Sequence, residues 1–265
     1  MKKKPTQFQL NPNWAQFQEA QKSQSKPSRR FNNSETETRK TILGKRKERV
    51  DDSPSLLNVL EPVNGDSSVT DEIAMDCEMV GVGLGNKSAL GRVTLVNKWG
   101  NVIYDEFVRP IERVVDFRTQ ISGIRSWDLR KAKDFWIVQN KVAELIKGRI
   151  LVGHALRNDL KALLLSHPKK DLRDTSVYQP FKREQGSVRA LRHLAAEFLG
   201  VEIQNGEHCP VEDARAAMLL YQKNRQIWEK SVKLQLKLKE KQKKRGKGKR
   251  KRKEGDDLKT DHAEY

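Results

Sequence analysis

The sequence lacks the features that hold small secreted proteins or zinc modules together. It has only two cysteines, Cys77 and Cys209, and neither lies in a CxxC or Cys/His zinc pattern. We therefore expect free thiols and no disulfide framework. No apolar run approaches the length of a membrane span, and the first residues lack the hydrophobic segment of a secretion signal. These absences predict a soluble intracellular protein with no membrane association.

Apolar residues are also scarce, since 36% of the 265 residues are hydrophobic and 33% are charged. The shortage is greatest at the two ends, where no apolar periodicity is sustained. We expect a disordered basic arm over residues 1–70 and a basic, largely disordered or helical tail over residues 231–265. Residues 71–230 remain as one domain of ordinary size, long enough to bury a core.

Positive charge is abundant and unevenly placed. The formal net charge is +18, and residues 239–253 alone hold 11 basic residues and one acidic residue. Such a density attracts polyphosphates and is also a pattern that nuclear import machinery reads. The run favours a nuclear, nucleic-acid-rich location. A solvated tail that only aids solubility is the alternative.

Acidic residues with a fixed spacing form three short motifs. Asp76 and Glu78 lie in AMDCEMVG, Asp159 lies in LVGHALRNDL, and His208 and Asp213 lie in EHCPVEDARAAMLL. Alternate residues of a strand point to the same face, so one strand would present Asp76 and Glu78 together. Asp159 and Asp213 each sit where a strand or loop gives way to a predicted helix, a natural edge for a cleft.

Carboxylates in this arrangement suit phosphodiester cleavage only if cations accompany them. Two divalent cations about 3.5–4 Å apart can hold the attacking and leaving oxygens and absorb the developing charge. Hard oxygen ligands favour Mg²⁺ or Mn²⁺. Each carboxylate alone could be a surface charge or a helix cap, and Asp213 is favoured at a helix start by the helix dipole. The three motifs together predict a two-metal nuclease site.

Periodicity predicts an α/β domain with a mixed central sheet and helices on its faces. Strands are expected over 72–80, 90–97, 101–108 and 149–152, the second and third forming a hairpin around Gly100. Helices are expected over 134–147, from Asn158 to about Ser166, over 188–199 with Ser187 as N-cap, and from Pro210 past Tyr221.

The same motifs resemble those of the DEDD superfamily of exonucleases, in the subgroup with histidine in the third motif. The residue sequences of these motifs, together with RDT between the second and the third motif, are most similar to those of the RNA exonuclease 4 family. The resemblance covers about residues 71–230. It implies an RNase H-like exonuclease fold and hydrolysis of RNA in the 3′-to-5′ direction. One departure is Arg157, where relatives often carry histidine.

The resemblance also implies roles for the motif residues. Asp76, Glu78, Asp159 and Asp213 would bind two divalent ions, Mg²⁺ or Mn²⁺, with Asp76 bridging them, and His208 would be the general base. A histidine with an unperturbed pKa near 6.5 can be neutral and accept a proton from water. His154 is the rival base, but its place after a buried strand favours a structural role. Asp174 could be mistaken for a fifth metal ligand, and a structural role is preferred for it as well.

Substrate contacts are less specified by the sequence. We expect Arg157, two residues from Asp159, to contact phosphate, and Met79 with Leu84 to form an apolar wall for the terminal base; further candidates for phosphate contact are Arg125, Lys161, Arg189 and Arg192. By resemblance the substrate is a ribosomal RNA precursor, bound with help from the basic tails by a nucleolar, monomeric enzyme. Two alternatives stay open: a catalytically silent RNA-binding ribosome-assembly factor, and a single-stranded DNA 3′-to-5′ exonuclease.

Overall fold

The computed structural model of the protein describes residues 59–260, and their side chains as far as residue 242. Most of the predicted N-terminal arm, residues 1–58, lies outside the described residues. Within the described part, no helix is both long and apolar enough to cross a membrane.

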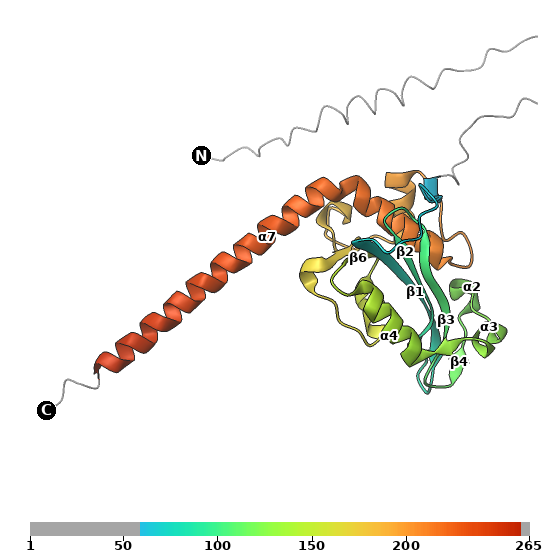
Figure 1. Ribbon diagram of the computed structural model, residues 1–265, viewed down its shortest axis with the longest axis horizontal. Helices are drawn as coiled ribbons and strands as arrows, with labels where there is room; N and C mark the ends of the chain where they lie inside the picture. Colours follow the sequence, from blue (N-terminus) through green and yellow to red (C-terminus); the bar gives the residue numbers. More distant parts are fainter. Residues whose placement is uncertain (1–58, 261–265) are drawn as a thin grey trace, which may run out of the picture. The chain divides into compact units, whose positions relative to one another are not determined.

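A mixed β-sheet forms the centre of the domain (Figure 1). Within residues 59–260 it has seven strands, in the order β5-β3-β2-β1-β6-β7, with β4 paired to the end of β1. The strands are β1 (Glu72–Val82), β2 (Lys87–Asn97), β3 (Val102–Arg109), β4 (Val114–Asp116), β5 (Lys133–Asp134), β6 (Ile150–Gly153) and β7 (Leu172–Asp174). The antiparallel β1–β2–β3 meander and the parallel β1–β6–β7 half confirm the expected mixed sheet.

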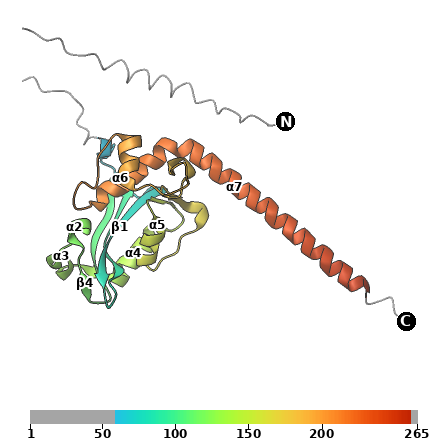
Figure 2. The ribbon, with the colours of Figure 1, turned by 180° about the vertical axis from the view of Figure 1, so that it is seen from behind.

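Helices cover both faces of this sheet. They are α2 (Thr119–Ser122), α3 (Ser126–Arg130), α4 (Phe135–Ile146), α5 (Leu156–Ala162), α6 (Leu191–Leu194), a π turn over Ala195–Leu199, and α7 (Pro210–Thr260). Ile73, Met75 and Cys77 of β1 belong to the apolar cluster that contains residues of α4 and α5, while Ala74 belongs to the cluster of α6 and α7. Figure 2 shows α4 and α5 beside β1. Side chains alternate between the two faces of β1, and β1 therefore contributes to a separate apolar core on each face of the sheet.

The ordered domain begins before residue 71. Asn97 donates through Nδ2 to the carbonyl oxygens of Asp66 and Ser68, and the amide of Val63 donates to Trp99. This segment thus packs on the turn between β2 and β3, where Gly100 has a φ of 88°. The hairpin predicted around Gly100 is present, and it also anchors the incoming chain.

Two predicted helices have different bounds in the structure. Helix α5 ends at Ala162 and not near Ser166, because Leu164 takes a left-handed φ of 54°. The stretch 188–199 is helical only from Leu191, with Ala190 and not Ser187 at the N-cap. The carbonyl of Ser187 instead accepts from the amide of Arg183, so this residue belongs to a preceding turn.

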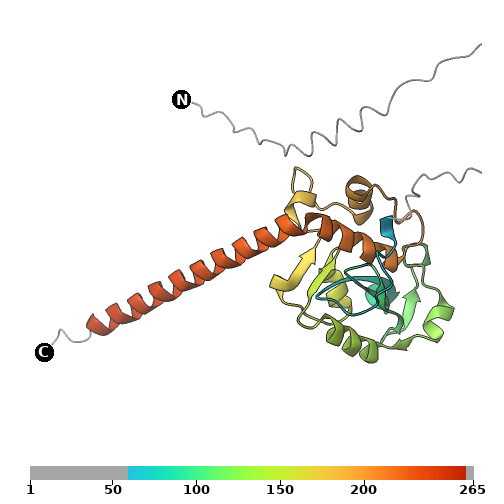
Figure 3. The same cartoon turned by 45° about the horizontal axis from the view of Figure 1, so that its top comes forward.

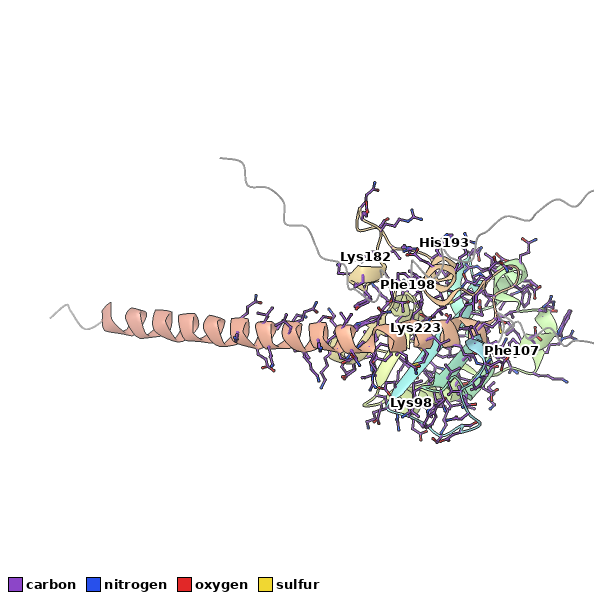
Figure 4. All side chains as sticks on the ribbon, turned by 90° about the horizontal axis from the view of Figure 1, so that it is seen from above. Lys98, Phe107, Lys182, His193, Phe198 and Lys223 are labelled. Atoms are coloured by element: carbon purple, nitrogen blue, oxygen red, sulfur yellow. The ribbon has the colours of Figure 1, made fainter. Side chains whose placement is uncertain are left out.

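Helix α7 begins at Pro210 as expected and runs through the tail to Thr260 (Figure 3). Its first turns pack on β1, β2 and β6. Trp228 stacks on Tyr178 with ring centroids 3.7 Å apart, and Glu229 accepts two hydrogen bonds from the buried Arg173. Lys223 donates to the carbonyl of Phe198, and Figure 4 labels both residues. These contacts fix the part of α7 that carries Asp213.

Candidate active site

Strand β1 supplies the first pair of carboxylates. Asp76 and Glu78 lie on one face of the strand, and Glu78 is only 5% exposed. Across the strand pair, Asp76 lies opposite Thr94 and Glu78 lies opposite Arg92. The next pair is Met79 with Leu90, so Gly91 of β2 forms a β-bulge immediately beside the site. Bulges at such positions re-aim side chains next to active sites.

Gly91 packs closely against Ile124 there, and a larger residue would require the Ile124 side chain to shift. A Cβ atom at this position would lie 2.5 Å from Cδ1 of Ile124, closer than real carbon contacts allow. The spacing of Asp76 and Glu78 is set by the alternation of side chains along β1, and the bulge shifts the register directly after Glu78.

Strand β6 and helix α5 bring in the third carboxylate. β6 runs parallel to β1, and a Cβ at Gly153 would lie 2.8 Å from the carbonyl oxygen of Met75. The chain then turns through Ala155, whose φ is 58° and whose amide donates to Asp174. Asp159 follows in the first turn of α5, buried at 4% exposure.

Asp174 has the structural role that the sequence favours for it. Its Oδ1 accepts from the amides of Ala155 and Ser176 and from the hydroxyl of Ser176. These three bonds fix the orientation of the Asp174 carboxylate. Asp174 fixes the turn that leads to Asp159.

The loop before α7 and the first turn of α7 complete the group. His208 Nδ1 lies 3.9 Å from Oδ2 of Asp213, and ligand atoms of Glu78, His208 and Asp213 all lie within 4.8 Å of one another. The amide of His208 donates to the carbonyl of Ile121, and Glu207 pairs with Arg125. Arg125, a candidate for phosphate contact, is therefore engaged in holding this loop.

The four carboxyl groups disturb one another electrostatically. Burial, together with the charges of Asp159, Asp213 and Glu78, raises the pKa of Asp76 well above its usual value. Burial and the charge of Asp213 raise the pKa of Glu78 to about 8, against the opposing effect of Arg92. Burial also raises the pKa of Asp159 to about 7 and that of Asp213 to about 6. The four groups form one cluster that resists ionisation without a cation.

The donor set fits a divalent cation. Asp213 is 3% exposed, and its Oδ1 has no hydrogen-bond partner among the described residues. A buried carboxylate oxygen normally has a partner, and carboxylates are the ligands preferred by Mg²⁺ and Mn²⁺. Glu78 and Asp213 are the carboxylates within ligand distance of each other, with Asp76 and Asp159 close enough to interact electrostatically.

The two histidines near the site have different settings. Burial lowers the pKa of His208, and the charge of Arg192 lowers it further, so this imidazole is neutral at physiological pH. His154 contacts Thr175 through Nδ1 at 2.8 Å, and the Thr175 hydroxyl donates to the carbonyl of Gly153. This bonded arrangement agrees with the structural role expected for His154. His208 is the histidine that lies next to the carboxylates.

A cleft of about 960 Å³ opens in front of these groups. Its lining includes Asp76, Glu78, Asp159 and His208, and it also includes Met79. The structure does not bring Leu84 or Arg157 to this lining. Leu84 is 99% exposed in the turn between β1 and β2, and Arg157 is exposed on α5.

Other apolar and basic residues line the cleft. Leu90 and Phe135 lie with Met79 in the lining, and basic side chains come from β2, α5 and the segment before α2, namely Lys87, Lys161 and Arg118. Lys161 is a predicted phosphate contact, whereas Lys87 and Arg118 carry no signal in the sequence that separates them from other surface cations. Gln204, which donates to Asp213, is likewise unmarked by any pattern.

Comparison with known proteins gives the class. The model of the exonuclease family RNase_T matches residues 73–221. This span is more than half of the chain and includes all five motif residues, and the chain belongs to this exonuclease family. The expected RNase H-like exonuclease fold is thereby confirmed.

Individual relatives confirm the resemblance to RNA exonuclease 4. The chain is 49% identical over 183 residues to "RNA exonuclease 4" of Xenopus laevis, a match that covers 68% of this chain and 44% of that protein. It is 53% identical over 161 residues to "RNA exonuclease 4" of Saccharomyces cerevisiae, covering 60% of this chain and 56% of that protein. The chain spans about half the length of these curated relatives.

A solved structure shows the same fold. The Pan2 pseudoubiquitin hydrolase-RNA exonuclease module of Saccharomyces cerevisiae, in complex with AAUUAA RNA, is 29% identical with a TM-score of 0.53. The match covers 61% of this chain and 30% of that one.

The raised carboxyl pKa values predict that stability depends on both pH and cations. Because Glu78 and Asp213 bind protons more tightly in the folded state than when unfolded, stability of the cation-free protein falls as pH rises from the unfolded values, about 4, through about 8. Chelator-treated protein should melt at lower temperature at pH 8.5 than at pH 5.5. Added Mn²⁺ should raise the melting temperature more at pH 8.5.

Glu78→Gln provides the comparison for this measurement. It removes the ionisation with the pKa of about 8, so it should flatten the pH dependence of the cation-free protein. A melting temperature that is independent of pH in the chelator-treated wild type would contradict the electrostatic account of the cluster.

Proposed function

We propose that this chain is a 3′-to-5′ exoribonuclease that hydrolyses phosphodiester bonds with the help of two divalent cations. The observation that carries the proposal is the buried carboxylate cluster, with the unpartnered Oδ1 of Asp213 and a neutral His208 beside it in a cleft. The RNA-bound Pan2 module supports RNA as the substrate class.

The carboxylates would hold the cations in a fixed place. Asp76, Glu78, Asp159 and Asp213 would hold the two ions. When bound, the ions polarise the phosphate, activate water and neutralise the charge that develops on the oxygens. The residues themselves provide position: β1, α5 and α7 are each fixed by core packing, so the ligands do not need to assemble at each turnover.

His208 would accept a proton from the attacking water. Burial keeps its imidazole neutral, and the loop that carries it is tied to Ile121 and Arg125, so the ring stays at the rim of the carboxylate cluster. Proton transfer by a positioned side chain contributes about 100-fold to 10,000-fold to a rate. Asp213 at 3.9 Å would stabilise the imidazolium that forms.

The first test is the effect of Asp76→Asn on a 5′-labelled RNA with a single-stranded 3′ end. Wild type with Mg²⁺ or Mn²⁺ should give a ladder that shortens from the 3′ end, and a chelator should abolish it. Loss of a ligand that interacts with three other carboxylates should lower the rate about a thousandfold or more. Asp71→Asn is the matched control, because Asp71 is an exposed carboxylate immediately before β1, and this variant should retain full activity.

RNA binding without product under any cation, in wild type as in Asp76→Asn, would reject this function. That result would favour the catalytically silent RNA-binding ribosome-assembly factor. The intact carboxylate cluster argues against this alternative.

The role of His208 can be tested separately from that of the carboxylates. His208→Ala should lower kcat about 100-fold to 10,000-fold with little change in KM for RNA, because the side chain acts on water and not on substrate binding. Single-turnover rates in saturating Mn²⁺ measure this effect. His193→Ala, which changes an exposed histidine of α6, should leave the rate unchanged. An unaltered rate in His208→Ala would assign the base to another group.

Preference for RNA over DNA separates the two nuclease hypotheses. Matched oligoribonucleotides and oligodeoxyribonucleotides of one sequence should be degraded at different rates, with RNA the faster, since discrimination requires contact with the 2′-hydroxyl. Comparing kcat/KM for the two substrates makes the measurement. Equal or faster degradation of DNA would favour the single-stranded DNA exonuclease.

We further propose a nucleolar role in processing ribosomal RNA precursors, with the enzyme acting as a monomer. Support comes from the basic run over 239–253 and from similarity to RNA exonuclease 4. The basic tails would add affinity for phosphates that is independent of sequence.

A further inference from the structure

A glutamine outside the three motifs contacts the site directly. Gln204 lies in the loop between the π turn and α7, and its Nε2 donates to Oδ2 of Asp213 at 2.8 Å. An ionised carboxylate only accepts hydrogen bonds, so the amide nitrogen and not the amide oxygen must face it. The bond joins the loop that carries His208 to the helix that carries Asp213.

This bond determines which way the carboxylate of Asp213 points. His208 Nδ1 lies 3.9 Å from the same Oδ2, which is too long for a hydrogen bond. Oδ1 is buried and has no partner among the described residues. With Oδ2 held by Gln204, Oδ1 is the oxygen of this carboxylate that has no partner among the described residues, and one oxygen of the carboxylate lies within 4.8 Å of ligand atoms of Glu78 and His208.

The backbone around Gln204 holds its side chain ready for this contact. Gln204 has a left-handed φ of 60°, a conformation that residues other than glycine and asparagine rarely adopt. Val201 and Ile203 beside it are each 3% exposed and belong to the same apolar cluster as Ala214 and Ala217 of α7. The strained conformation is thus stabilised by burial of the chain that precedes it, while Asn205 and Gly206 after it are exposed.

We propose that Gln204 is a positioning residue that fixes the orientation of the Asp213 carboxylate for binding a divalent cation. It would act only through Asp213 and would touch neither the RNA nor the cation. Such outer partners orient ligands, and their loss costs about tenfold to a hundredfold in metal affinity. The inference rests on the proposed function, because it requires a cation at Asp213.

The test compares Gln204→Met with wild type, using the full chain. Methionine keeps the length of the side chain and removes the donor, and Gln204 is partly exposed, so the fold should persist. Binding of Mn²⁺, measured from the electron paramagnetic resonance signal of the free ion, should weaken about tenfold to a hundredfold. RNA cleavage should need more Mn²⁺ and recover in excess Mn²⁺, with KM for RNA unchanged.

Asn205→Ala is the matched control. Asn205 is exposed in the same loop and bonds only to Glu202 among the described residues. This variant should bind Mn²⁺ as wild type does. A weakening of the same size in Asn205→Ala would show a general loosening of the loop and overturn the positioning role.

Asp213→Asn distinguishes failure of this inference from failure of the proposed function. If wild type binds Mn²⁺, Asp213→Asn binds it poorly and Gln204→Met binds it as wild type does, the inference about Gln204 is wrong and the cation site stands. If wild type binds no Mn²⁺, or if Asp213→Asn binds it equally well, the cation site itself is wrong and the role of Gln204 falls with it.

Discussion

Burial of four neighbouring carboxylates is the constraint that the rest of this structure serves. Burial raises the pKa of Asp76, Glu78, Asp159 and Asp213, and at Asp76 and Glu78 the charges of the other carboxylates raise it further, so their proximity is unfavourable in the absence of positive charge. Packing elsewhere must hold them together. Two apolar clusters do so, one joining β1 to α4 and α5 and the other joining it to α6 and α7.

Each ligand-bearing segment is fixed by contacts that lie away from the cleft. The turn before Asp159 is held by Asp174, and the part of α7 that follows Asp213 is held by Trp228 and Glu229. The unfavourable burial of the carboxylates is thus compensated by packing contacts elsewhere in the domain, as is usual at functional sites.

The sequence was sufficient for features set by local geometry. Alternation along β1 places Asp76 and Glu78 on one face, and the helical start at Pro210 follows from ordinary capping rules. That Asp159 and Asp213 join this pair depends on strand order over long separations, which periodicity does not encode. The resemblance to known exonucleases supplied that link.

Features created by long-range contacts were missed or misplaced for the same reason. The periodic stretch 188–199 suggested one helix, but Arg189 pairs with Glu197, and the chain forms a short helix followed by a π turn. Arg118 and Gln204 belong to irregular segments with left-handed backbone, where neither period nor propensity marks a residue. Leu84 is next to a motif in sequence yet lies at the exposed tip of a hairpin.

Helix α7 has a consequence for any attempt to divide the protein. Its first turn bears Asp213, its middle closes the core through Trp228, and the same uninterrupted helix of 51 residues runs into the basic tail. The composition changes near residue 230, but no structural joint accompanies that change. A cut placed by composition would fall within about one helical turn of Trp228 and fray the end of the core. The domain that carries the carboxylates and the basic tail share helix α7. A truncation that leaves the domain intact must therefore keep several helical turns of the tail attached to it.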